Sequence, residues 1–335
     1  MIQSNVDLQP YNTFGLSCKA ERFATFKNAE ELAEILSHRG TDELLVLGGG
    51  SNILLTRDFD GLVIKNEVLG FDVVESDDTS VLVESGAGEV WHEFVMRCID
   101  EGFGGIENLS LIPGSVGASP MQNIGAYGVE IKDTFDSLQA YHIESGKVHT
   151  FNHEQCEFGY RESVFKRALK GQYIILSVRF RLSREHKLNT SYGAIETELR
   201  SMGVENPTIK DVSNAVINIR SSKLPDPKKI GNAGSFFKNP VVEQKAVDAI
   251  AERYEQFPQY PAPNGKIKLA AGWLIEQAGW KGKDFGTYGV HKNQALVLVN
   301  YGGSQGSQIF DLSEQIIQDV QSKFGITLER EVNMI

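Results

Sequence analysis

The stretch LLVLGGGSNILL, residues 44–55, decides the fold class of this chain. Its apolar ends predict two buried strands, and three successive glycines between them predict a tight turn. Successive backbone N–H groups in such a turn can converge on an anion. The turn is not a P-loop, because no Lys-Ser or Lys-Thr closes it, and it lacks the G-x-G-x-x-G spacing. Taken alone, the stretch is more simply interpreted as a structural turn.

A second glycine-rich segment, residues 102–128, strengthens the anion-binding interpretation. Its sequence, GFGGIENLSLIPGSVGASPMQNIGAYG, is almost uncharged. A connection this long within a compact domain is usually functional. Two such loops together would surround a pyrophosphate with neutral backbone donors, without Lys or Arg. The pattern therefore predicts a dinucleotide held without the Rossmann fingerprint.

The rest of the chain alternates between helical and extended patterns. Apolar spacing predicts helices at 30–38, 89–101, 241–256, 269–278 and 306–324. Alternating or continuous apolar runs predict strands at 61–66, 71–76, 80–88, 137–143, 147–151, 172–182, 295–300 and 326–332. On the last of these, Thr327, Glu329 and Glu331 share one face, and the intervening residues share the other. The mixture predicts an α+β fold.

Composition limits the class of protein. A chain of 335 residues with 41% hydrophobic and 23% charged residues is expected to form two or three globular domains. Its net charge of −11 argues against a nucleic-acid partner. No apolar run suits a membrane span, and the N-terminus lacks the pattern of a signal peptide. The odd number of widely spaced cysteines suits reduced thiols, so we expect a cytoplasmic protein. The cysteines have no zinc-site spacing, so we expect no metal site. Nothing in the sequence requires an obligate protein partner.

The stretch GNAGSFFKNP, residues 231–240, places one serine, Ser235, between a glycine turn and two phenylalanines. Such a serine can cap a helix, bind a ligand or transfer a proton, and these alternatives remain open. Nearby lies a basic group, which is either a solvated loop or a clamp for phosphate or carboxylate. Its members are Arg220, Lys223, Lys228 and Lys229. Arg161, in FGYRESVFK, more commonly would pair with Glu157 or Glu162 on the surface.

Eight motifs, in order along nearly the whole chain, resemble those of one enzyme family. They are LVLGGGSNILL, IENLSLIPGSVGASPMQNIGAYGVEI, GYRESVFK, KLPDP, GNAGSFFKNP, AGWLIEQAGWKG, HKNQALVLVN and FGITLEREV. Together they resemble the UDP-N-acetylenolpyruvoylglucosamine reductases (MurB family, type I). Tyr192, in NTSYGA, is similar to the mobile tyrosine of the first type of this family.

The resemblance implies a fold and a reaction. It implies a two-part FAD-binding domain of the vanillyl-alcohol-oxidase type, residues 1–66 with 325–335 and residues 67–217, and a substrate-binding α+β domain at 218–324. Non-covalent FAD would be reduced by NADPH and would pass a hydride to UDP-N-acetylglucosamine enolpyruvate. The product, UDP-N-acetylmuramate, serves peptidoglycan and hence cell-wall synthesis, cell shape and cell division. Such an oxidoreductase would act on small molecules as a cytoplasmic monomer.

The resemblance also implies roles for single residues. Arg161 and Glu331 would stabilise an enolate, with Glu331 protonated or sharing a proton, and Ser235 would protonate the enolate. Substrate contacts would come from Tyr192, Arg220, Lys223, Asn239 and Gln294. Cofactor contacts would come from Gly48, Gly49, Gly50, Ser51, Asn52, Pro113, Gly114, Ser115, Gly117, Ala118, Ser119, Gln122, Asn123, Ile124 and Gly125. The family's YNTF motif corresponds to Tyr11, Asn12, Thr13 and Phe14.

Two departures and two alternatives accompany the resemblance. The chain ends at Ile335, soon after Glu331, so we expect a less firmly anchored terminal strand; Ser115 stands where the family often has cysteine. An oxidase or dehydrogenase of the same flavin fold is a first alternative. It often binds flavin covalently through His or Cys, and the two glycine loops offer neither. A non-enzymatic protein that binds UDP-sugars is the second alternative.

Overall fold

The computed structural model describes all residues from Met1 to Ile335. They form two compact units, each built from separate segments of the chain. The first unit comprises Met1–Val6, Ala20–Gly49 and Asp60–Ser222, and the second comprises Asp7–Lys19, Gly50–Phe59 and Lys223–Ile335. The predicted boundaries at residues 66, 217 and 324 stay a prediction.

A four-stranded sheet forms one layer of the first unit. Its order is β1 (Gln3–Asp7), β2 (Lys19–Phe26), β5 (Phe59–Asn66) and β3 (Glu43–Leu47), with β3 parallel to β5. Helix α1 (Ala29–Ser37) begins after Asn28, whose side chain accepts a hydrogen bond from the Glu31 N–H. Leu32 and Ile35 of this helix pack on β2 and β5, because both point to the apolar side of the helix.

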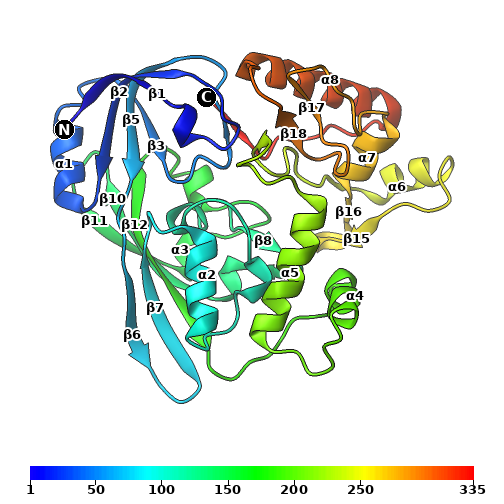
Figure 1. Ribbon diagram of the computed structural model, residues 1–335, viewed down its shortest axis with the longest axis horizontal. Helices are drawn as coiled ribbons and strands as arrows, with labels where there is room; N and C mark the ends of the chain where they lie inside the picture. The colour runs from blue at the N-terminus through cyan, green and yellow to red at the C-terminus, as the bar shows by residue number, and fades with distance from the viewer. The chain divides into compact units, whose positions relative to one another are not determined.

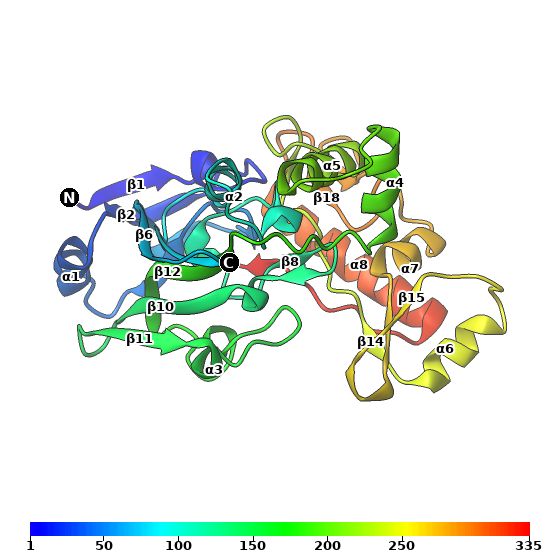
Figure 2. The same ribbon diagram turned by 90° about the horizontal axis from the view of Figure 1, so that it is seen from below.

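A five-stranded antiparallel sheet forms the larger layer of the first unit. Its order is β11 (Val148–Asn152), β10 (Phe135–His142), β12 (Tyr173–Ser183), β7 (Ser80–Gly86) and β6 (Phe71–Ser76). Helix α2 (Trp91–Asp100) lies along this sheet (Figure 1) and buries Trp91, Phe94 and Val95 in the same core as β7 and β12. The short helix α3 (His153–Cys156) lies beside β11 (Figure 2).

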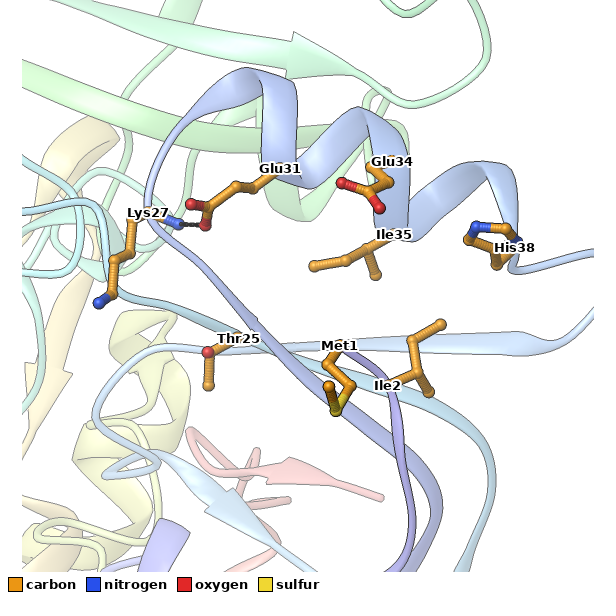
Figure 3. Close-up of a pocket in the computed structure, with 8 residues that line it drawn as sticks. All are labelled: Met1, Ile2, Thr25, Lys27, Glu31, Glu34, Ile35 and His38. Atoms are coloured by element: carbon orange, nitrogen blue, oxygen red, sulfur yellow. Dashed lines mark hydrogen bonds between the residues drawn. The ribbon is translucent and has the colours of Figure 1, made fainter.

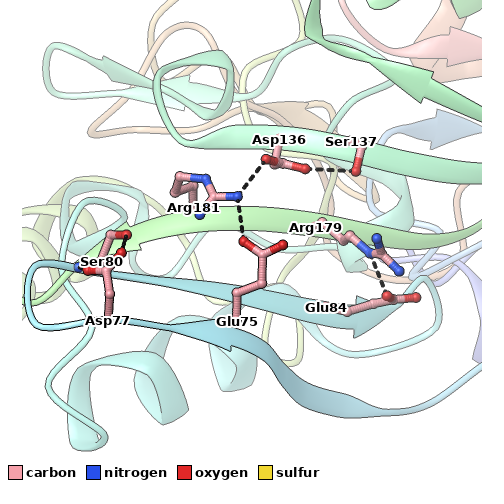
Figure 4. A network of polar contacts seen from close by, with 8 residues as sticks. All are labelled: Glu75, Asp77, Ser80, Glu84, Asp136, Ser137, Arg179 and Arg181. Carbon is pink, nitrogen blue, oxygen red and sulfur yellow. Dashed lines mark hydrogen bonds and ion pairs between the residues drawn. The ribbon is translucent and has the colours of Figure 1, made fainter.

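Charged side chains cover part of the five-stranded sheet (Figure 4). Arg181 of β12 bridges Glu75 and Asp136 at 3.1 and 3.2 Å, and Arg179 pairs with Glu84 at 2.6 Å. These pairs join four neighbouring strands from β6 to β10. Because alternate residues of a strand point to opposite faces, Val178 and Phe180 on the same strand enter the core.

The first unit also contains short strands and two helices after the sheets. The strands β8 (Gly125–Ala126) and β9 (Val129–Glu130) form a hairpin in the long glycine-rich segment. Helices α4 (Gly193–Ser201) and α5 (Ile209–Lys223) pack together through Ile195, Leu199, Val212 and Val216. Neither helix was predicted from the sequence.

The second unit contains the long helix α8 (Gly306–Phe324), which buries one face, and several small sheets. Its other helices are α6 (Gln244–Ala251) and α7 (Ala271–Gln277). The three-stranded sheets are β13 (Gly231–Asn232), β18 (Leu298–Asn300) and β17 (Tyr288–Val290), and β14 (Val241–Val242), β16 (Ile267–Leu269) and β15 (Gln259–Pro261). Phe236, Phe237 and Ile316 are fully buried in its core. No helix of the structure combines the length and apolar character needed to cross a membrane.

Two predictions about elements are wrong. Residues 220–223, the start of the stretch 220–240 that its Pro, Gly and Lys content predicts to be a loop, belong to helix α5. The predicted strand at 326–332 is extended chain with a single bridge, Phe237 to Arg330, although Ile326, Leu328 and Val332 are buried as the alternation required. The chain is paired beyond it, where β19 (Asn333–Met334) lies parallel to β4 (Ile53–Leu54).

The chain end is firmly held, contrary to expectation. Ile335 donates its N–H to the Leu54 carbonyl at 3.0 Å, and its carbonyl accepts from the Thr56 N–H at 2.8 Å. Both partners flank the short strand β4, so the pairing of β4 with β19 continues to the last residue.

Candidate functional site

The two glycine-rich loops meet in the first unit. A Cβ atom added to Gly48 would lie 2.2 Å from the Ser115 hydroxyl oxygen, and one added to Gly49 would lie 2.9 Å from the Gly114 Cα. Any side chain at either position would therefore separate the loops. The sequence predicted this convergence from the composition of the two loops alone.

Two polar side chains of the second loop form hydrogen bonds to other residues of the protein. Asn123 is fully buried, and its Nδ2 donates to Glu130 at 3.0 Å and to the Gly159 carbonyl at 3.0 Å. Its Oδ1 accepts from the Lys132 N–H, and the Ser119 hydroxyl donates to the Val116 carbonyl. A ligand at these two predicted residues would therefore meet backbone groups and not their side chains. The segments 48–52 and 113–125 carry no charged side chain.

Backbone strain gathers around the same loop. Four residues have a positive φ between 43° and 59°, a conformation that is uncommon for residues other than glycine. They are Leu111, Asn123, Tyr127 and Arg161. Such residues tend to cluster at functional sites, where the surrounding structure holds them. The Arg161 guanidinium is anchored, since its Nη2 donates to the Gly125 carbonyl at 2.7 Å. Glu157, one of the surface partners considered for Arg161, pairs instead with Arg167.

Two tyrosines and a second arginine extend this part of the first unit. The rings of Tyr127 and Tyr192 pack edge to face with centroids 5.4 Å apart. The Arg220 guanidinium lies near the Tyr127 hydroxyl and donates through Nε to the Leu111 carbonyl at 3.2 Å. Burial lowers the pKa of Arg220, a change that Tyr127 opposes and the nearby charge of Arg161 reinforces. A buried guanidinium that is further destabilised by a like charge favours an anionic ligand.

The residue that sequence reasoning missed here is Tyr127. It joins Tyr192 to Arg220, and burial raises the pKa of its hydroxyl although Arg220 opposes the rise. Its one signal in the sequence is an aromatic residue between glycines, GAYG, in a segment that is otherwise almost uncharged.

In the second unit, four segments distant in sequence converge. The Asn232 N–H donates to the Thr13 carbonyl at 3.0 Å, and the Thr13 N–H donates to the Gly50 carbonyl at 3.1 Å. Asn52 continues the series, because its Nδ2 donates to the Glu331 carbonyl at 3.2 Å. The YNTF, GSN, GNAGSFF and LEREV motifs are thus linked by hydrogen bonds.

A short antiparallel ladder pairs the segment that follows Ser235 with the segment that contains Glu331. The Glu331 N–H donates to the carbonyl of Phe236, the residue after Ser235, at 2.9 Å. Phe237 and Arg330 form the adjoining bridge. Ser235 is exposed, whereas Phe236 and Phe237 behind it are buried. The helix-cap alternative is wrong, because the next helix, α6, begins after Glu243.

The remaining predicted residues of the second unit lie on other loops. The Asn239 Oδ1 accepts from the Ala271 N–H at 2.9 Å, so only its Nδ2 is left to meet a ligand as a donor. Gln294 lies in the loop between β17 and β18, where its Oε1 accepts from the Leu296 N–H at 3.3 Å. Lys223 is exposed at the end of α5.

A groove of about 610 Å³ on the first unit lies apart from all the predicted residues. Figure 3 shows its lining, with Glu31, Glu34 and Ile35 of α1 facing Met1, Ile2 and Thr25. The predicted residues thus form two groups. Arg161, Tyr192, Arg220 and the two glycine loops up to Gly49 are in the first unit, and Gly50 to Asn52, Lys223, Ser235, Asn239, Gln294 and Glu331 are in the second.

Family models match both parts of the chain. Residues 20–152 match a model described as FAD binding domain, which includes both glycine loops. Residues 226–335 match the C-terminal domain of UDP-N-acetylenolpyruvoylglucosamine reductase, which includes Ser235, Asn239, Gln294 and Glu331. These matches confirm the expected α+β class, with an FAD-binding domain followed by a second domain.

Curated relatives match along the whole chain. The UDP-N-acetylenolpyruvoylglucosamine reductase of Flavobacterium johnsoniae is 53% identical and covers 100% of this chain and 99% of its own. The proteins of the same name from Chromobacterium violaceum and Pseudomonas syringae are each 50% identical, over 98% and 99% of this chain and 97% and 98% of their own. The crystal structure of the Thermus caldophilus reductase has the same fold, with a TM-score of 0.70 at 23% identity, covering 100% of this chain and 99% of that one.

Proposed function

The chain belongs to the UDP-N-acetylenolpyruvoylglucosamine reductase family, and we propose roles for its residues in the reduction of UDP-N-acetylglucosamine enolpyruvate. The enzyme is an oxidoreductase of peptidoglycan synthesis that uses FAD and NADPH. Bound FAD would supply the redox chemistry, the transfer of a hydride from NADPH to the enolpyruvyl methylene carbon. The protein must then hold a substrate carboxylate, stabilise an enolate and deliver one proton.

The glycine loops fit the pyrophosphate of FAD. Gly48 and Gly49 lie against Gly114 and Ser115 so closely that no side chain would fit, and no charged residue lies in either loop. Backbone N–H groups and hydroxyls would then supply the donors. Gly48 to Asn52 and Pro113 to Gly125 would hold the cofactor, with Asn123 and Ser119 keeping the second loop in shape through their bonds within the protein.

Arg161 supplies fixed positive charge to the substrate carboxylate. Its guanidinium is already oriented by the Gly125 carbonyl, at 2.7 Å, so little reorganisation is needed when the enolate forms. The planar guanidinium suits a carboxylate because it can donate two parallel hydrogen bonds.

Ser235 donates the proton, and Glu331 supports the enolate as a protonated acid. The single observation that supports this assignment is the hydrogen bond from the Glu331 N–H to the carbonyl of Phe236, the residue that follows Ser235. A charged Glu331 would repel the enolate, whereas a protonated one can donate a hydrogen bond. The buried Phe236 and Phe237 limit the water around the serine from one side.

The UDP-sugar is bound by groups that differ in chemistry. Arg220 and Lys223 supply cationic donors for the diphosphate, while Asn239 and Gln294 supply amides. Tyr192 is exposed at the start of α4, and its ring packs on Tyr127. Tyr127 also lies near Arg220, so movement of Tyr192 toward a ligand would change the surroundings of the Arg220 guanidinium.

We infer a cytoplasmic location and a monomer. All three cysteines are buried and free, as suits a reducing compartment. The nucleotide-linked substrate and NADPH, which the family uses, are also intracellular metabolites. No partner protein is required by the roles proposed above.

Anaerobic spectroscopy of the purified protein tests the function. The protein reconstituted with FAD should be bleached by NADPH and then regain its flavin absorbance when UDP-N-acetylglucosamine enolpyruvate is added. Lack of a flavin band after reconstitution would favour a binding protein, and reoxidation by dioxygen but not by the enolpyruvyl substrate would favour an oxidase. Either result would overturn the proposal.

A further inference from the structure

Lys238 is a buried cation next to the proposed catalytic segment. Its side chain is only 9% exposed, yet its Nζ forms an ion pair with Glu329, whose side chain is 70% exposed. Taking an ammonium group out of water is unfavourable unless a partner compensates it. The carboxylate of the exposed Glu329 therefore compensates the charge of the buried Lys238 ammonium.

The Lys238–Glu329 ion pair joins the two extended segments that contain Ser235 and Glu331. The Lys238 N–H donates to the Glu329 carbonyl at 2.9 Å, so main chain and side chain link the same two residues. Two residues along, the Glu331 N–H donates to the Phe236 carbonyl. The ion pair thus closes one end of the ladder that places Glu331 beside Ser235.

Arg330 fixes the same segment from its other side. Its Nε donates to the Ser313 hydroxyl of α8 at 2.8 Å, its Nη2 pairs with Glu314, and its guanidinium lies 4.8 Å from the centre of the Phe310 ring. Each residue of the sequence Glu329-Arg330-Glu331 is therefore tied to a neighbour in the second unit by a side-chain or main-chain bond.

We propose that Lys238 is a positioning residue for the reduction, and that its ion pair with Glu329 holds the register between the extended segments that contain Ser235 and Glu331. This inference rests on the proposed roles of Ser235 and Glu331. Without the pair, the exposed Glu329 side chain turns into solvent and the segment that contains Glu331 shifts. A misplacement of about 1 Å can slow a reaction by about 10²-fold.

The experiment measures the two half-reactions of the FAD-loaded enzyme separately by stopped-flow. In Lys238→Met, reduction of the flavin by NADPH should stay within about twofold of wild type, because only the second half-reaction uses the ladder. Reoxidation by UDP-N-acetylglucosamine enolpyruvate should slow by about 10²-fold. Lys238→Arg keeps the cation and should recover most of the rate. The matched control is Lys266→Met, which breaks the exposed pair of Lys266 with Glu243 in the same unit and should leave both half-reactions unchanged.

Thermal unfolding supplies a readout that does not depend on activity. Glu329→Gln removes the negative charge that pairs with the buried ammonium and should lower the melting temperature more than Lys238→Met, which leaves an exposed carboxylate in water. The double variant should melt above Glu329→Gln alone. If Lys238→Met slows both half-reactions equally, or neither, or if Lys238→Arg is as slow as Lys238→Met, the inference is wrong. Failure of the wild-type enzyme to be reoxidised would instead reject the proposed function.

Discussion

At the scale of single residues, the proposed site depends on a few side chains that other residues hold in place. Arg161 and Tyr127 keep left-handed backbone conformations that their residue types disfavour. The Arg161 side chain is held by a hydrogen bond to the Gly125 carbonyl, and the Tyr127 ring packs on Tyr192. Lys223 differs from both because it is exposed at the end of α5. Its role is therefore expected to be binding, with little part in positioning other groups.

Replacing Lys223 by alanine should chiefly raise the apparent KM for the enolpyruvyl substrate. An exposed cation attracts a diphosphate equally in the ground state and the transition state, and loss of such uniform binding leaves kcat nearly unchanged. Steady-state kinetics at saturating NADPH would measure both constants, with Lys228→Ala as a neighbouring control. A fall in kcat at unchanged KM would instead place Lys223 in the chemistry.

At the scale of elements, the turn between β6 and β7 is held by one carboxylate. Asp77 accepts from the N–H groups of Thr79 and Ser80 at 2.8 and 2.7 Å, which lowers its pKa from 3.8 to about 2. Because the folded-state pKa is depressed, the stabilisation is complete above pH 3.8 and is lost as the pH falls toward about 2.

Asp77→Ala should therefore lower the urea midpoint of unfolding at pH 7, and the difference from wild type should shrink as the pH approaches 2. Parallel urea titrations at several pH values would measure it, with Asp78→Ala as the adjacent control. A difference between Asp77→Ala and wild type that does not change with pH would show that the carboxylate does not hold the turn.

Helix α1 offers a second prediction at this scale. Asn28 caps it by accepting from the Glu31 N–H at 2.8 Å. Asn28→Ala should lower the free energy of unfolding by about 1 kcal/mol, whereas Asn28→Asp should preserve it. Denaturant titration distinguishes the two, and equal stability of the alanine variant and wild type would mean that the cap contributes nothing.

At the scale of the whole molecule, all three cysteines are enclosed in folded structure. Cys18, Cys98 and Cys156 are buried and free, and burial raises the pKa of each thiol, for Cys156 to about 12. Thiolate is the reactive form, so the native protein should react negligibly with a thiol reagent at pH 8, and fully only after denaturation. A thiol that reacts rapidly in the native state would contradict the burial described here.

The sequence predicted long periodic elements well, but it predicted poorly those local features that depend on tertiary contacts. Helix α8 was predicted at 306–324 and lies at those residues, because its apolar stripe covers one face over five turns. The helical conformation of residues 220–223 was missed because the following Pro and Gly residues dominate the local composition. The use of Asn239 to bind the α7 N-terminus, and the strain at Tyr127, arise from tertiary contacts that no local pattern encodes.

The central claim is that Ser235 donates the proton in the second half-reaction, and stopped-flow of Ser235→Ala tests it most directly. Flavin reduction by NADPH should remain close to wild type. Reoxidation by UDP-N-acetylglucosamine enolpyruvate should slow by about 10²- to 10⁴-fold, the usual contribution of a positioned acid. Equal slowing of both half-reactions, or reoxidation at the wild-type rate, would contradict the account.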